Sequence, residues 1–122
     1  YIMNNERYTQ DQRDLSSMNY ENYMEKILQN FKELYRLIKT SNFEKKEFYP
    51  VIFKVGTGRR GTQGIIDMSM EFQVAAKSVG FVVWDIFYNQ LHSPWGAVNW
   101  ERNYINKYTQ KNHETNLVFC KF

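Results

Sequence analysis

Between residues 18 and 39, apolar side chains recur every three or four positions, as they do along one face of an α-helix. Ser17 or Asn19 can cap the start of this segment, and acidic residues early and basic residues late complement the helix dipole. The pattern predicts a long amphipathic helix whose apolar face belongs to the core. That face consists of Met24, Ile27, Leu28, Phe31, Leu34, Tyr35 and Ile38.

Three later segments are typical of β-strands. Residues 48–55 are rich in β-branched and aromatic side chains, and Pro50 predicts an edge strand or a strand that begins after the proline. Residues 66–74 alternate strictly between apolar and polar, which favours a half-buried strand. A helix is the weaker alternative there, supported by Met68, Phe72, Ala75 and Val79. Residues 81–88 are apolar on both faces except at Asp85, which is typical of a central strand.

The remaining elements complete an α+β prediction. A turn is expected over 75–80, a second, shorter helix begins at Ser93-Pro94, and residues 116–122 form a last strand. Short turns between strands imply hairpins. We therefore expect a mostly antiparallel sheet of about four strands, packed against the long N-terminal helix and the second helix. Residues 1–16 are a polar N-terminal arm, and residues 17–122 form a single globular domain.

Composition narrows the class of protein. The 122 residues suit one domain, and 43% apolar content with 17% aromatic content argues against global disorder. There is no apolar run long enough for a transmembrane helix and no signal-peptide pattern at the start. Cys120 is the only cysteine, so no intrachain disulfide can form. These features predict a soluble protein in the cytoplasm that does not bind membranes.

Residues 56–64 are the first candidate for chemistry because four of the nine are glycine and two adjacent ones are arginine. Glycine-rich backbone can direct N–H groups at an anion, and guanidinium groups bind phosphate. The order does not match a Walker A loop. The alternative is a solvated hairpin tip without a ligand. The candidate phosphate-binding residues are Lys54, Gly58, Arg59, Arg60, Gly61 and Thr62.

Aromatic side chains are the second candidate. Most of the 21 rings are expected in the core, which leaves Trp84, Tyr88 and Trp95 as candidates for stacking on nucleic-acid bases. Trp95 and Trp100 flank the start of the second predicted helix, and exposed rings there would favour a homo-oligomer or a protein partner.

A catalytic set is the third candidate. Glu71 would act as a general base, and His92 or His113 as a general acid, beside arginine or lysine side chains, as a metal-independent ribonuclease requires. In a hairpin of residues 66–74 with 81–88, Glu71 would lie near Trp84 and Tyr88. The two histidines and Cys120 have no metal-ligand spacing, so no metal or other cofactor is expected.

Three functions follow. The preferred one is a small, non-catalytic binding module that contacts nucleic acid or a phosphorylated nucleotide through the basic glycine-rich hairpin and aromatic side chains. The first alternative is a small metal-independent ribonuclease of the toxin type. The second is a protein–protein inhibitor or an assembly subunit, for which a phage or virus would be one source. The net charge of +3 does not separate them.

Overall fold

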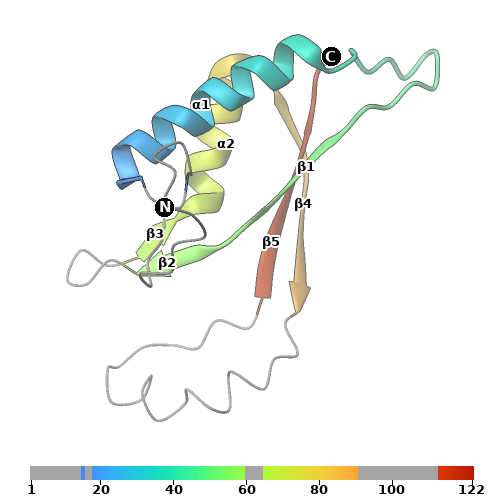
Figure 1. The fold of residues 1–122 in the computed structure, drawn as a ribbon. Helices are drawn as coiled ribbons and strands as arrows, with labels where there is room; N and C mark the ends of the chain where they lie inside the picture. Colours follow the sequence, from blue (N-terminus) through green and yellow to red (C-terminus); the bar gives the residue numbers. More distant parts are fainter. Residues whose placement is uncertain (1–14, 16–17, 60–64, 91–112) are drawn as a thin grey trace.

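The computed structural model describes residues 15, 18–59, 65–90 and 113–122, and of residues 57–59, 65–66 and 113 it describes the backbone. This part of the chain is α+β, with a three-stranded antiparallel sheet, a separate two-stranded pair and two α-helices (Figure 1). The elements are α1 (Tyr20–Leu37), β1 (Val51–Val55), β2 (Thr57–Arg59), β3 (Ile65–Asp67), α2 (Met68–Val79), β4 (Val82–Gln90) and β5 (His113–Cys120). The predicted helix at Ser93-Pro94, with Trp95 and Trp100, lies outside the described residues, as do residues 1–14 of the predicted arm.

Helix α1 lies within the segment predicted from the apolar stripe. Its N-cap is Asn19, whose side-chain oxygen accepts a hydrogen bond from the Asn22 N–H at 2.8 Å. Ile27 and Phe31, two members of the stripe, are buried. The helix therefore forms for the expected reason: its apolar face packs into the core and its first turn is capped.

The three-stranded sheet has the order β1-β5-β4, with both pairs antiparallel. Strand β1 begins directly after Pro50 and lies at an edge, as predicted. The prediction that residues 81–88 form a central strand is wrong for the sheet that the structure describes, where β5 is central and β4 is an edge strand. The apolar residues of β4 misled the prediction because several of them, Trp84, Phe87 and Tyr88, are exposed.

The predicted strand over 66–74 is also wrong, as is the predicted turn over 75–80. Only Ile65–Asp67 are extended, and the chain then continues as α2 to Val79. Met70 and Val74, which a half-buried strand would bury, are 64% and 61% exposed. The buried positions have helical spacing instead, and they are Met68, Phe72, Ala75 and Ala76. The helix keeps Met68 and Phe72 of the alternating set in the core and adds Ala75 and Ala76 to it.

Strand β4 pairs with β5 rather than with residues 66–74. Glu71 therefore does not share a sheet with Trp84 and Tyr88, and the predicted hairpin between these segments is wrong. Glu71 instead occupies the first turn of α2, where its charge suits the positive end of the helix dipole.

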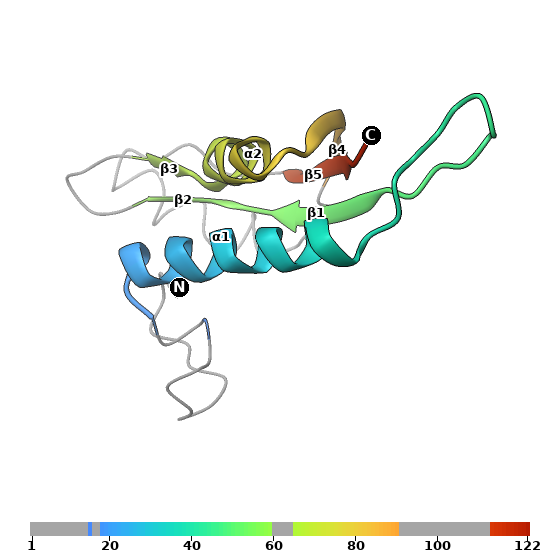
Figure 2. The same cartoon turned by 90° about the horizontal axis from the view of Figure 1, so that it is seen from above.

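The core lies between the two helices and one face of the sheet. Phe31 of α1 is at its centre, with ring centroids 4.9 Å from Phe53, 5.5 Å from Phe119 and 5.9 Å from Phe72. Phe53 pairs with Leu117 across the sheet, so both point toward the helices, and residues at alternate positions point away. The opposite face carries Ile52, Lys54, Asn116 and Val118, and no described helix covers it (Figures 1 and 2).

The two ends of the described structure differ in character. The β2–β3 pair lies at one end, and the connector between α1 and β1, residues 38–50, projects at the other (Figures 1 and 2). Strands β1 and β2 are separated only by Gly56 and run on in one direction. At about 3.3 Å per residue, Val51 and Arg59 are about 25 Å apart. Within the described part of the chain, no helix has the length and apolar character needed to span a membrane.

Candidate ligand-binding site

The glycine- and arginine-rich segment connects two paired strands. Strands β2 and β3 are antiparallel, with Thr57 opposite Asp67 and Arg59 opposite Ile65. Of the candidate phosphate-binding residues, Gly58 and Arg59 lie in β2. Arg60, Gly61 and Thr62 lie outside the described residues. Two paired strands therefore precede and follow residues 60–64, although β2 lies within the segment predicted as a turn, and the anion-binding role of this segment stays a prediction.

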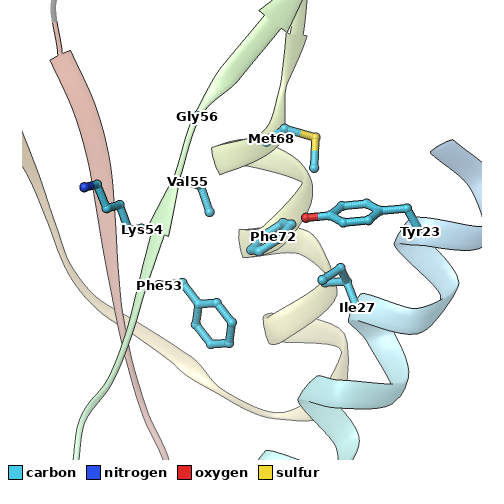
Figure 3. A pocket seen from close by; sticks show the side chains of 8 residues that line it. All are labelled: Tyr23, Ile27, Phe53, Lys54, Val55, Gly56, Met68 and Phe72. Atoms are coloured by element: carbon cyan, nitrogen blue, oxygen red, sulfur yellow. The ribbon is translucent and has the colours of Figure 1, made fainter. Parts of the chain in front are cut away.

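A pocket lies where this hairpin meets the core, between α1, α2 and β1 (Figure 3). Its volume is about 380 Å³, which is within the usual range for small-molecule sites. The lining residues are Tyr23, Ile27, Phe53, Lys54, Val55, Gly56, Met68 and Phe72. Most of this lining is apolar or aromatic, and Gly56 is the residue that leads directly into β2. The pocket and the hairpin therefore adjoin.

Tyr23 gives the pocket wall a polar group. Its ring comes from α1 and lies 6.4 Å from the Phe72 ring of α2, and in Figure 3 its hydroxyl points toward Met68 and Phe72. Burial raises the pKa of the Tyr23 hydroxyl, because loss of water disfavours the phenolate. Tyr23 thus brings a neutral hydroxyl into an apolar surrounding at neutral pH.

Lys54, another candidate phosphate ligand, contributes mainly backbone to this pocket. Its side chain points away from the other lining side chains (Figure 3), toward the face of the sheet opposite the helices. There its ammonium group lies 2.6 Å from the carboxylate of Glu114 on β5. A phosphate at Lys54 would have to compete with this carboxylate.

The start of α2 is occupied by its own cap. The Asp67 carboxylate accepts hydrogen bonds from the Ser69 and Met70 N–H groups at 3.0 and 3.4 Å. These donors are therefore not free for an anion.

Of the candidate stacking residues, Trp84 lies away from the hairpin, whereas Tyr88 is level with Val55, the last residue of β1, because both are paired with Thr115. Trp84 contacts exposed rings of the 38–50 connector at the opposite end of the sheet, including Phe43 at 5.1 Å between ring centroids. Tyr88 is exposed farther along β4, opposite Thr115. Trp95 lies outside the described residues. The structure therefore does not bring Trp84 and strand β2 together into one surface.

The candidate catalytic residues are not assembled in the described residues. Glu71 is exposed on α2, and its side chain makes no hydrogen bond or ion pair with another described residue. His113 is the first residue of β5, paired with Gln90, and His92 lies outside the description. Within the same part of the chain, no group of three or more histidine, cysteine, aspartate or glutamate side chains is placed to hold a metal ion.

Sequence reasoning missed the pocket. Tyr23 and Phe53 were expected as ordinary helix and strand positions, and nothing in the local pattern distinguishes a ring beside a cavity from a ring in a filled core. Comparisons with protein-family models, curated protein sequences and solved structures found no match for this chain.

Proposed function

We propose that this protein is a non-catalytic module that binds a phosphorylated nucleotide, either free or at the end of a nucleic acid. The base would occupy the pocket between α1, α2 and β1, and the phosphates would contact Arg59 and Arg60 of the hairpin. One observation carries the proposal: an aromatic-lined pocket of about 380 Å³ ends at Gly56, the residue from which the arginine-bearing hairpin starts.

The pocket lining suits a base. Bases stack on aromatic rings, and each such contact contributes about 1–3 kcal/mol. Tyr23, Phe53 and Phe72 supply rings from three different elements. The Tyr23 hydroxyl adds a group that can hydrogen-bond to the edge of a base.

The spacing between pocket and arginines also suits a nucleotide. Arg59 is three residues beyond Gly56, or about 10 Å along an extended strand. This is comparable with the distance between base and phosphates across a ribose. A guanidinium group can bind phosphate through two parallel hydrogen bonds, and two adjacent arginines can serve a di- or triphosphate.

Equilibrium binding of ATP, GTP and a 5′-phosphorylated dinucleotide, measured by calorimetry at low and high salt, tests the proposal. We expect Arg59→Ala/Arg60→Ala to weaken binding by about tenfold or more, since hydrogen bonds to charged groups contribute about 1.5–3 kcal/mol each. Binding by the same variant should also depend less on salt concentration, because two cationic contacts are lost. Lys45→Ala/Lys46→Ala is the matched control, because it removes the same charge at the opposite end of the molecule and should leave binding unchanged.

A second variant tests the pocket separately. Gly80 is the only glycine with a positive φ among the described residues, so Gly56 can accept a side chain without backbone strain. Gly56→Leu should narrow the pocket and reduce nucleotide affinity toward that of inorganic pyrophosphate. If wild-type protein binds pyrophosphate as tightly as ATP, the pocket has no role in binding. If wild-type protein binds neither the nucleotides nor pyrophosphate, the proposal is wrong.

A further inference from the structure

Three aromatic rings give the pocket between α1, α2 and β1 its shape (Figure 3). The rings of Tyr23 and Phe72 lie 6.4 Å apart between centroids, and their planes are inclined by 31°. The ring of Phe53 stands nearly perpendicular to that of Phe72, at 76° and 5.9 Å. A flat ligand that lies parallel to Phe72 therefore meets Phe53 at close to a right angle, which is one of the arrangements that aromatic rings prefer.

The polar side chains of this lining are few. Among the described residues that line the pocket, none carries a carboxylate or an amide side chain. The ammonium group of Lys54 points away from the cavity and is paired with Glu114. The hydroxyl of Tyr23 is therefore the polar side-chain group that the described lining offers to a ligand. Because burial raises the pKa of this hydroxyl, it is protonated at neutral pH and can both donate and accept a hydrogen bond.

Buried apolar side chains make up much of the remaining wall. Ile27, Val55, Met68 and Phe72 each have less than a tenth of their surface exposed. A ligand group that rests against these side chains loses its contact with water. If that group is a hydrogen-bond donor or acceptor, it finds no partner there, and the loss lowers affinity. The pocket should therefore discriminate between flat ligands by the number of polar groups on their edges.

The nucleic-acid bases differ in the partners that their edges need. Guanine presents its N1–H and N2 amino donors side by side, and a carboxylate is the side chain that accepts from two such donors together. Adenine has an amino group beside a ring nitrogen, and it carries a C–H where guanine carries the N2 amino group. Cytosine and uracil are single rings, so they cover less of the aromatic wall than a purine does. A lining with one hydroxyl and no carboxylate among its described residues suits adenine best.

We propose that the pocket selects adenine among the bases, and that Tyr23 is the residue that determines this preference. The inference rests on the proposed function, because it names the base of the nucleotide that the pocket and the hairpin would bind together. The Tyr23 hydroxyl hydrogen-bonds to the edge of adenine that carries the amino group, and the C–H edge lies against apolar side chains. Guanine in the same position would bury donors that have no acceptor, and a pyrimidine would leave part of the aromatic wall uncovered.

Calorimetry of the full chain with ATP, GTP and CTP tests the inference. Wild-type protein should bind ATP about tenfold or more tightly than GTP and CTP, because buried groups without partners and lost ring contact both reduce affinity. Tyr23→Phe keeps the ring and removes the hydroxyl, so its affinity for ATP should fall toward that for GTP. Binding of inorganic pyrophosphate, which has no base, should not change. Tyr49→Phe is the matched control, since Tyr49 belongs to the 38–50 connector and does not line the pocket.

The outcomes separate this inference from the proposed function. If the three nucleotides bind equally tightly and Arg59→Ala/Arg60→Ala weakens all of them, the protein binds nucleotides without selecting adenine, and the inference alone is wrong. The same holds if GTP or CTP binds more tightly than ATP. If Tyr23→Phe is folded by circular dichroism and retains the full preference for ATP, Tyr23 does not determine it. If wild-type protein binds no nucleotide, the inference and the proposed function fail together.

Discussion

Cys120 shows how burial alone changes the chemistry of a side chain. It is fully buried in β5, although it lies on the face of the sheet away from the helices. Loss of water raises the pKa of its thiol, because the thiolate would be poorly solvated there. A buried thiol with a raised pKa is a weak nucleophile, so Cys120 serves as a small apolar side chain rather than as a reactive group.

This residue gives a pH dependence with a definite sign. In the unfolded chain the thiol loses its proton at about pH 8.5, whereas in the folded protein it keeps its proton to a higher pH. The free energy of unfolding should therefore be unaffected by this group below that pH and should fall above it. The slope is at most about 1.4 kcal/mol per pH unit for one group. Urea unfolding of wild type and Cys120→Ala between neutral and alkaline pH measures the difference, and equal slopes in the two proteins would contradict the assignment.

In helix α2, the alternating apolar pattern led to the wrong prediction of a strand, whereas the capping residues would have led to the correct prediction of a helix. Strict alternation over 66–74 favoured a strand, but Asp67 and Gly80 are the N-cap and C-cap of a helix of 12 residues. Gly80 has φ +113° in the left-handed region, and its N–H bonds the last carbonyls of α2. Weighing these caps against the alternation would have favoured the helix. The Pro50 signal, in contrast, predicted either an edge strand or a strand that begins after the proline, and both hold for β1.

Gly80, the C-cap of α2, should tolerate even a small side chain poorly. A Cβ there would lie 3.1 Å from the Tyr35 ring, in addition to the strain of a positive φ. We expect Gly80→Ala to lower the free energy of unfolding by about 1–3 kcal/mol. Lys77→Ala, in the exposed last turn of α2, is the control and should change stability little. Chemical denaturation measures both, and a neutral Gly80→Ala would show that Tyr35 moves freely aside.

At the scale of the whole molecule, the α+β class followed from sequence but the order of strands did not. Strand β5 pairs with β1, about sixty residues earlier in the chain, and no local pattern encodes such a partner. Apolarity on both faces of β4 was interpreted as central burial, whereas Trp84 lies among exposed rings. Surface rings and core rings look alike in sequence. For the same reason, the pocket beside Tyr23 and the exposed rings around Trp84 emerged only when the elements were assembled.

The distance between the hairpin and Trp84 makes a last prediction possible. About 25 Å of strand lies between Val51 and Arg59, and Trp84 does not line the pocket. Effects of substitutions at such distances usually add within about 0.3–0.5 kcal/mol. Trp84→Ser should therefore leave nucleotide affinity unchanged, and it should not alter the loss of affinity that Arg59→Ala/Arg60→Ala causes.

Calorimetry of the two variants and of their combination measures this independence. Additivity would agree with a binding site confined to the pocket and the hairpin. A loss of nucleotide affinity in Trp84→Ser would contradict it, and would mean that the sheet transmits a change between its ends through the β1–β5 pair that connects them.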